Sequence, residues 1–87
     1  MDEIFGVAAF RSRQQMFHFA SALERAGIRT QVISTPREVQ VGCGLSVRFE
    51  LGDAGKVMDV YRRNNPGNLI GFYRVTPGRG PGRISPL

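Results

Sequence analysis

Two amphipathic helical patterns, set among four extended apolar runs, are the feature that most restricts how this chain of 87 residues can fold. We expect strands at residues 4–10, 28–34, 45–51 and 69–75, and helices at about 12–26 and between Asp53 and Asn64. The order β-α-β-β-α-β within about 75 residues predicts an α+β domain with the ferredoxin-like split βαβ arrangement. In that fold, both helices cover one face of a four-stranded antiparallel sheet.

Each helical pattern carries boundary signals of its own. Ser12 followed by Gln15 is typical of a capping box, in which side chains satisfy backbone N–H groups at a helix start. Gly27 supplies the left-handed residue that ends the first helix, and Asp53 is expected to cap the second. The apolar positions of the first helix recur at helical spacing, at Met16, Phe19, Ala20, Leu23 and Ala26.

The run 45–51 has the cleanest period-two pattern in the chain. Its alternate positions separate Leu45, Val47, Phe49 and Leu51 from Ser46, Arg48 and Glu50. Because side chains alternate along a strand, the apolar set is expected beneath the helices and the polar set on the wet face. Phe49 then belongs to the core, so this strand lacks the exposed aromatic ring on which RNA-recognition domains of the same topology stack bases.

The formal net charge of +5 is unevenly distributed. Residues 1–59 contain seven basic and seven acidic side chains, so the whole excess lies after Asp59. Residues 77–87 hold three of the five prolines and little to bury, which predicts a flexible basic tail after a domain spanning 1–76. Such a tail binds polyanions without sequence preference, and we expect no specific nucleic-acid partner.

The sequence contains no pattern for membrane insertion or export. It begins Met1-Asp2-Glu3, acidic where a secretory signal is basic, and no apolar run approaches the ~20 residues needed to span a bilayer. A single cysteine cannot form an internal disulfide, which agrees with a reducing compartment. We therefore expect a cytoplasmic location and no membrane partner.

Cys43, the only cysteine, lies between Gly42 and Gly44. Glycines remove steric cover and allow backbone angles that turn a sulfur outward from a loop. Arg37 and Arg48 lie six and five residues away, and a guanidinium close to a thiol favours the thiolate. A free cysteine is also a common small core residue, and Cys43 shares the parity of the apolar set in the next strand, so a structural role stays open.

The residue patterns of metal centres, phosphate-binding loops and paired catalytic carboxylates are not evident in this sequence. There is one histidine, His18, with no acid cluster beside it, so neither a metal centre nor a cofactor is expected. No phosphate-binding Gly-Lys-Ser/Thr loop and no paired catalytic carboxylates are evident, which favours a carrier or binding protein over a classical enzyme. The adjacent Arg37 and Glu38 either form a weak local ion pair or shape the cysteine loop.

The same residues resemble a known family. An apolar strand with Phe10 and Ser12 precedes an Ala/Leu helix that ends in Ala26-Gly27-Ile28, and then come Thr35-Pro36-Arg37-Glu38 and Cys43-Gly44-Leu45-Ser46-Val47-Arg48-Phe49. Over about residues 4–75, this pattern is similar to that of the small bacterial Se/S carrier-like family, long described as a domain of unknown function. Members usually carry serines immediately before the cysteine, whereas residues 39–42 here read Val-Gln-Val-Gly.

The resemblance implies a carrier that holds sulfur or selenium on Cys43, as a persulfide or selenosulfide, and hands it to a partner. Cys43 is then the carrier nucleophile, with Gly42 and Gly44 giving access and Arg37 and Arg48 favouring the thiolate. The partners implied are sulfur or selenium donor and acceptor proteins, and a homodimer is compatible with the role.

A hypothesis from a different class is a non-catalytic interaction or regulatory domain that acts through its sheet face. Gly6 and Ala8 would form a smooth apolar patch there if their face is the open one. Alkylation of native Cys43 separates the two hypotheses, because a cysteine that is core filler reacts only after unfolding.

Overall fold

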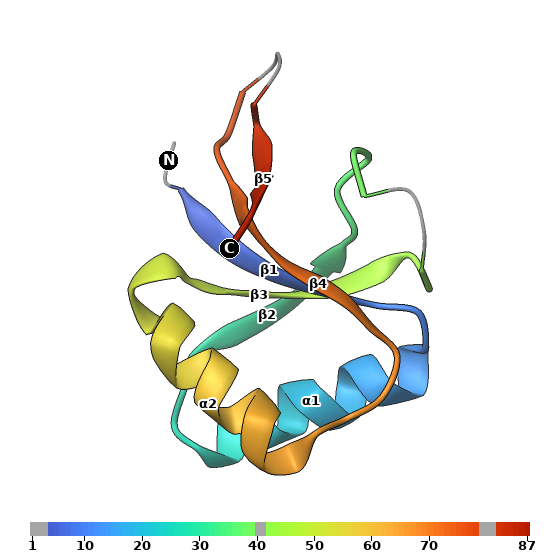
Figure 1. Ribbon diagram of the computed structural model, residues 1–87, viewed down its shortest axis with the longest axis vertical. Coiled ribbons are helices and arrows are strands. Elements are labelled where there is room, and N and C mark those ends of the chain that lie inside the picture. The colour runs from blue at the N-terminus through green and yellow to red at the C-terminus, as the bar shows by residue number, and fades with distance from the viewer. Residues whose placement is uncertain (1–3, 40–41, 79–81) are drawn as a thin grey trace.

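The computed structural model describes residues 4–39, 42–78 and 82–87, and it contains all six elements that the periodicities predict (Figure 1). These elements are β1 (Phe5–Phe10), α1 (Arg13–Arg25), β2 (Thr30–Ser34), β3 (Leu45–Glu50), α2 (Ala54–Asn64) and β4 (Leu69–Val75). A 3-10 turn at Leu51–Asp53 precedes α2, and an additional strand, β5 (Ile84–Pro86), follows β4. The predicted α+β class is confirmed.

The sheet is antiparallel and has five strands in the order β2-β3-β1-β4-β5. The predicted count of four is wrong, and the order differs from the simple ferredoxin-like one by the strand added beyond β4. β5 is held by backbone hydrogen bonds, which composition does not reveal: Thr76 N–H donates to the Arg83 carbonyl at 2.8 Å, and Leu87 N–H to the Phe72 carbonyl at 2.9 Å. Residues 79–81 of the predicted tail lie outside the described residues.

Both helices lie on one face of the sheet, as predicted (Figure 1). Val47 and Phe49 of β3 are buried in the cluster beneath them, and Leu45 packs against the same cluster. Arg48 and Glu50 alternate with these residues and stay outside the core. The register deduced from the period-two pattern is therefore confirmed, and a slip of one residue would exchange the two faces.

The centre of the core is an aromatic cluster around Phe19 of α1. Its ring contacts those of Phe10, Tyr61 and Phe72 at centroid distances of 5.5, 5.9 and 6.3 Å. Tilted and edge-on aromatic pairs of this kind contribute ~0.5–1.5 kcal/mol each beyond the burial of their area. One cluster thus joins both helices to β1 and β4.

The opposite face of the sheet is also largely covered. Four side chains that alternate onto it are at most 1% exposed, namely Val7, Ala9, Ser46 and Val75. The loop between β2 and β3 and the β4–β5 hairpin both project on this side of the sheet, away from the helices (Figure 1). Pro36 and Val39 of the loop are buried, and Ile84 of β5 pairs with Val75. The loop and the hairpin therefore shield the face that lacks helices.

The patch predicted at Gly6 and Ala8 is not a surface. Ala8 is fully buried in the core under the helices. A Cβ at Gly6 would lie 2.2 Å from the Phe49 ring, so the glycine leaves the room that this ring occupies. The prediction of an interaction patch at these residues is wrong because their small size serves internal packing.

The helix boundaries follow the sequence signals in part. The Ser12 hydroxyl accepts a hydrogen bond from Gln15 N–H at 3.2 Å, which confirms the predicted start of α1. Asp53 stands at the N-cap position of α2 but its side chain makes no cap hydrogen bond, so the predicted cap is wrong. The 3-10 turn leads into α2 instead, with Ala54 N–H bonded to the Leu51 carbonyl.

Candidate functional site

Cys43 lies at the end of the loop that connects β2 to β3, and its backbone is tied to the central strand β1. Its N–H donates to the Phe10 carbonyl at 3.2 Å, and its thiol donates to the Leu45 carbonyl with a sulfur-to-oxygen distance of 3.3 Å. The residue is half-buried, neither enclosed in the core nor fully exposed. Cys43 is thus fixed by one hydrogen bond from its backbone and one from its thiol, and part of the residue stays accessible.

Both glycines beside Cys43 adopt backbone angles that disfavour other residues. Gly42 has φ +118° and Gly44 has φ +87°. A Cβ at position 42 would also lie 2.6 Å from the Phe10 carbonyl oxygen and 2.7 Å from Ile70 Cδ1, whereas one at position 44 would meet nothing within 4 Å. Gly42 is therefore required by a close approach to β1, and Gly44 by its backbone angle.

The start of the cysteine loop, at Thr35, is held by hydrogen bonds to Gly44 and to Ser46 of β3. Thr35 N–H donates to the Gly44 carbonyl at 2.9 Å, which continues the β2–β3 ladder by one step. The hydroxyls of Thr35 and Ser46 lie 2.7 Å apart, and this contact satisfies the fully buried Ser46. Val39 N–H bonds to the Pro36 carbonyl at 2.9 Å in a turn within the loop. The described parts of the loop, residues 35–39 and 42–44, thus have hydrogen-bond partners at both ends.

Glu38 pairs with a residue that sequence proximity does not suggest. Its carboxylate accepts a hydrogen bond from Arg83 Nε at 3.1 Å, across 45 residues of sequence. Its neighbour Arg37 is exposed. Glu38 thus pairs with a distant residue and not with Arg37, and this ion pair links the loop to the C-terminal segment.

The two arginines predicted to support Cys43 are placed differently. Arg37 lies in the same loop and is exposed. Arg48 points to the face that lacks helices and stacks its guanidinium 4.0 Å from the centre of the Phe5 ring. Phe5 begins the six-residue β1 and Phe10, which anchors Cys43, ends it, so about 17 Å of strand separates them at ~3.3 Å per residue. The structure does not bring Arg48 to the thiol.

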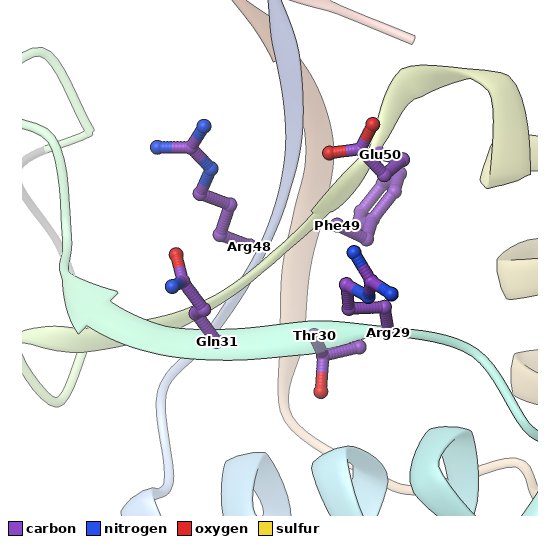
Figure 2. A pocket seen from close by; sticks show the side chains of 6 residues that line it. All are labelled: Arg29, Thr30, Gln31, Arg48, Phe49 and Glu50. Carbon is purple, nitrogen blue, oxygen red and sulfur yellow. The ribbon is translucent and has the colours of Figure 1, made fainter.

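A pocket of about 300 Å³ lies at the corner of the sheet where β2 begins and β3 ends (Figure 2). Arg29 and Gln31 from the β2 side and Arg48 and Glu50 from β3 extend to the same side of the two strands, and Thr30 points to the helices (Figure 2). Sequence reasoning missed this pocket. The alternation of the two strands places these side chains on one face, but only the register brings them together.

Within residues 4–39, 42–78 and 82–87, no group of three or more His, Cys, Asp or Glu side chains could hold a metal ion. In the same ranges, neither helix is long and apolar enough to cross a membrane. His18 is exposed on α1.

The chain matches the model of a known protein family. The family described as "Putative Se/S carrier protein-like" matches residues 5–72, which include β1 to β4 up to Phe72, the whole cysteine loop and both helices. No curated protein and no solved structure matches the chain. The match covers more than half of the sequence and contains the loop in which Cys43 is held, and the chain therefore belongs to the Se/S carrier protein-like family.

Proposed function

We propose that this protein carries sulfur or selenium on Cys43 and passes it to a partner protein. The observation that carries the proposal is the placement of Cys43, half-buried between two glycines of positive φ, in the loop of a chain that belongs to the Se/S carrier protein-like family. A carrier sulfur must be held in place and still be approachable by a second protein. The backbone bond to Phe10 supports the first requirement, and the partial exposure of Cys43 supports the second.

The proposed transfer is an exchange between sulfur atoms that needs no external oxidant. The Cys43 thiolate attacks the terminal sulfur of a donor persulfide, a new bond forms between the two sulfurs, and the donor thiolate leaves with the electron pair. Cys43 then holds a persulfide, or a selenosulfide when the terminal atom is selenium. An acceptor thiolate attacks that terminal atom in turn and releases the Cys43 thiolate.

In this proposal, several residues around Cys43 have roles of their own. The thiol proton bonds to the Leu45 carbonyl, and this bond is lost when the thiolate forms, so loading frees the sulfur from the backbone. Gly42 and Gly44 place no side chain over it, and exposed Arg37 supplies positive charge for the anionic thiolate or persulfide. The chain has one cysteine, so any resolving thiol belongs to the donor or acceptor. This chemistry suits the reducing cytoplasm.

The test is the mass of the intact protein after loading. The protein is incubated with inorganic polysulfide, freed of excess reagent and measured without reductant, with Cys43→Ser as the control. The expected result is an added mass of one sulfur atom on the native protein that disappears with reductant and is absent from Cys43→Ser. If native Cys43 neither loads nor reacts with an alkylating reagent until the protein is unfolded, the carrier proposal fails.

In that event, the second candidate is a non-catalytic interaction domain. The observation that favours it is the open edge of the sheet at β2. The sheet face predicted from the sequence is not a candidate surface, because both faces are largely covered. Binding without any thiol chemistry is the outcome that distinguishes it from the carrier.

A further inference from the structure

The edge strand β2 presents unpaired backbone groups to its surroundings. β2 ends the strand order, and among the described residues its only strand partner is β3. Thr35 N–H bonds to the Gly44 carbonyl, and in an antiparallel pair the residues that bond to the partner strand alternate with residues that face away. Thr30, Val32 and Ser34 therefore direct their N–H and C=O groups outward.

This edge lacks the features by which proteins block strand addition. Such features are charged side chains on the strand, proline, bulges and very short strands. Residues 30–34 read Thr-Gln-Val-Ile-Ser, and their pairing with β3 is regular. Val32 at the middle of the strand is 43% exposed. The opposite edge differs, because β5 has three residues and includes Pro86. β2 is thus the edge suited to accept another strand.

The two ends of β2 lie beside different features. At its start are the pocket of about 300 Å³ and the guanidinium of Arg29 (Figure 2). At its end, Ser34 pairs with Leu45, and Thr35 is bonded to Gly44, the residue after Cys43. A strand of five residues spans ~13–17 Å. An extended chain laid along β2 would therefore run from the charged pocket to the cysteine loop.

We propose that an extended, acidic segment of the donor or acceptor protein docks on β2 as an additional strand, with a carboxylate in the pocket beside Arg29. The proposal rests on the proposed function, because it assigns the docking site of the carrier's partner. Backbone hydrogen bonds to Thr30, Val32 and Ser34 hold the segment, and the carboxylate fixes its register. The part of the partner beyond the segment then meets Cys43.

Charge favours an acidic segment as the occupant. The pocket is lined by the two guanidinium groups of Arg29 and Arg48 and by the single carboxylate of Glu50, so the formal charge of its lining is positive. Within the described residues, Arg29 and Glu50 form no ion pair with each other, so Arg29 is available. A second copy of the chain is a poorer occupant, since residues 30–34 contain no acidic side chain to enter the pocket.

The test uses two synthetic peptides with blocked ends. One has the sequence Glu-Thr-Val-Thr-Val-Thr-Glu, which presents a carboxylate at the pocket in either strand direction, and the other has Lys in place of both Glu residues. Binding to the isotope-labelled protein is followed by the amide signals in NMR titrations. The acidic peptide is expected to shift the signals of Thr30, Val32 and Ser34, and to bind at least ~10-fold more tightly than the Lys peptide.

Two variants locate the binding on the protein. Val32→Pro removes an outward N–H but no hydrogen bond to β3, and edge strands tolerate such a substitution. It is expected to lower the affinity for the acidic peptide at least ~10-fold. Arg29→Glu changes an exposed side chain and is expected to lower the affinity for the acidic peptide by a similar factor. Arg63→Glu, on α2, makes the same charge change and is the control, because it is expected to alter this affinity less than ~2-fold.

The outcomes separate this inference from the carrier proposal. If both variants bind the acidic peptide as tightly as the unchanged protein, or if the shifted signals lie away from β2, the docking site is wrong. If the free protein is a dimer that Val32→Pro dissociates, a second copy occupies the edge and the proposal is also overturned. Cys43→Ser is expected to bind the peptide normally, and Arg29→Glu to load from polysulfide normally, so each proposal can fail alone.

Discussion

Glu38 in the cysteine loop and Arg83 before β5 form an ion pair with 3.1 Å between Oε2 and Nε. The pair joins two segments that cover the same face of the sheet and that lie far apart in the sequence. Its side chains are 44% and 25% exposed, so its contribution to the free energy of unfolding is small, below ~1 kcal/mol. Its effect is expected in the position of the loop more than in global stability.

Arg83→Gln is therefore expected to leave the melting temperature almost unchanged and to speed alkylation of native Cys43 severalfold, because the loop loses one of its ties. The measurement is the alkylation rate in the folded protein at low salt. Arg62→Gln is the matched control, since it removes the exposed ion pair with Asp59 on α2. Equal rates in both variants would contradict a tie between the loop and the C-terminal segment.

Removal of residues 82–87 is expected to lower the free energy of unfolding by ~1–3 kcal/mol. The truncation removes β5, the hydrogen bonds from Thr76 to Arg83 and from Leu87 to Phe72, and part of the cover over Val75. Urea denaturation of the shortened chain measures the change. An unaltered midpoint would instead support the division at residue 76 into a domain and a flexible tail, which stays a prediction.

Gly42→Ala is expected to destabilise the protein by ~1–3 kcal/mol, because the new Cβ clashes with the Phe10 carbonyl and φ is +118°. Gly52→Ala is the control, since a Cβ there meets nothing within 4 Å and needs no positive φ. The comparison is made by urea denaturation. A change of the same size in both variants would mean that the close approach to β1 does not constrain the loop.

The effects of Arg37 and Arg48 on the thiol can be distinguished by the alkylation rate of Cys43. Arg37→Gln is expected to slow the reaction of native Cys43 with a neutral alkylating reagent about twofold to fivefold, through loss of a positive charge in the same loop. Arg48→Gln is expected to change the rate little, because its guanidinium lies over Phe5 at the far end of β1. A larger effect of Arg48→Gln would show that the side chain reaches Cys43 in solution.

The elements and the register of β3 could be predicted because each rests on a local pattern. The alternation at Leu45, Val47 and Phe49 and the cap at Ser12 are properties of a few consecutive residues, and they are present as expected. β5 could not be predicted, because three residues have no measurable periodicity and the strand is held by its backbone.

The sequence was enough to identify the loop around Cys43, but not to predict which distant side chains lie near it. Glycine, cysteine and glycine in succession indicate a tight loop, and the structure shows one with two positive φ angles. However, the short separation between Cys43 and Arg48 in the sequence does not tell where the Arg48 side chain points. Because β3 is extended, Arg48 lies over Phe5 and not beside the thiol. The pairing of Glu38 with Arg83 and the convergence of Arg29 with Glu50 depend on tertiary structure, for which no local signal exists.

The position of Pro86 limits how this protein can assemble. Leu87 N–H is directed inward to the Phe72 carbonyl, so the nitrogen of the preceding Pro86 faces outward, where it has no hydrogen to offer. An added strand finds donors along β2 but not at this place on β5. A strand added at β5 would have an acceptor without a donor opposite Pro86, so edge-to-edge growth that joins β2 to β5, and with it an open-ended fibre, is disfavoured.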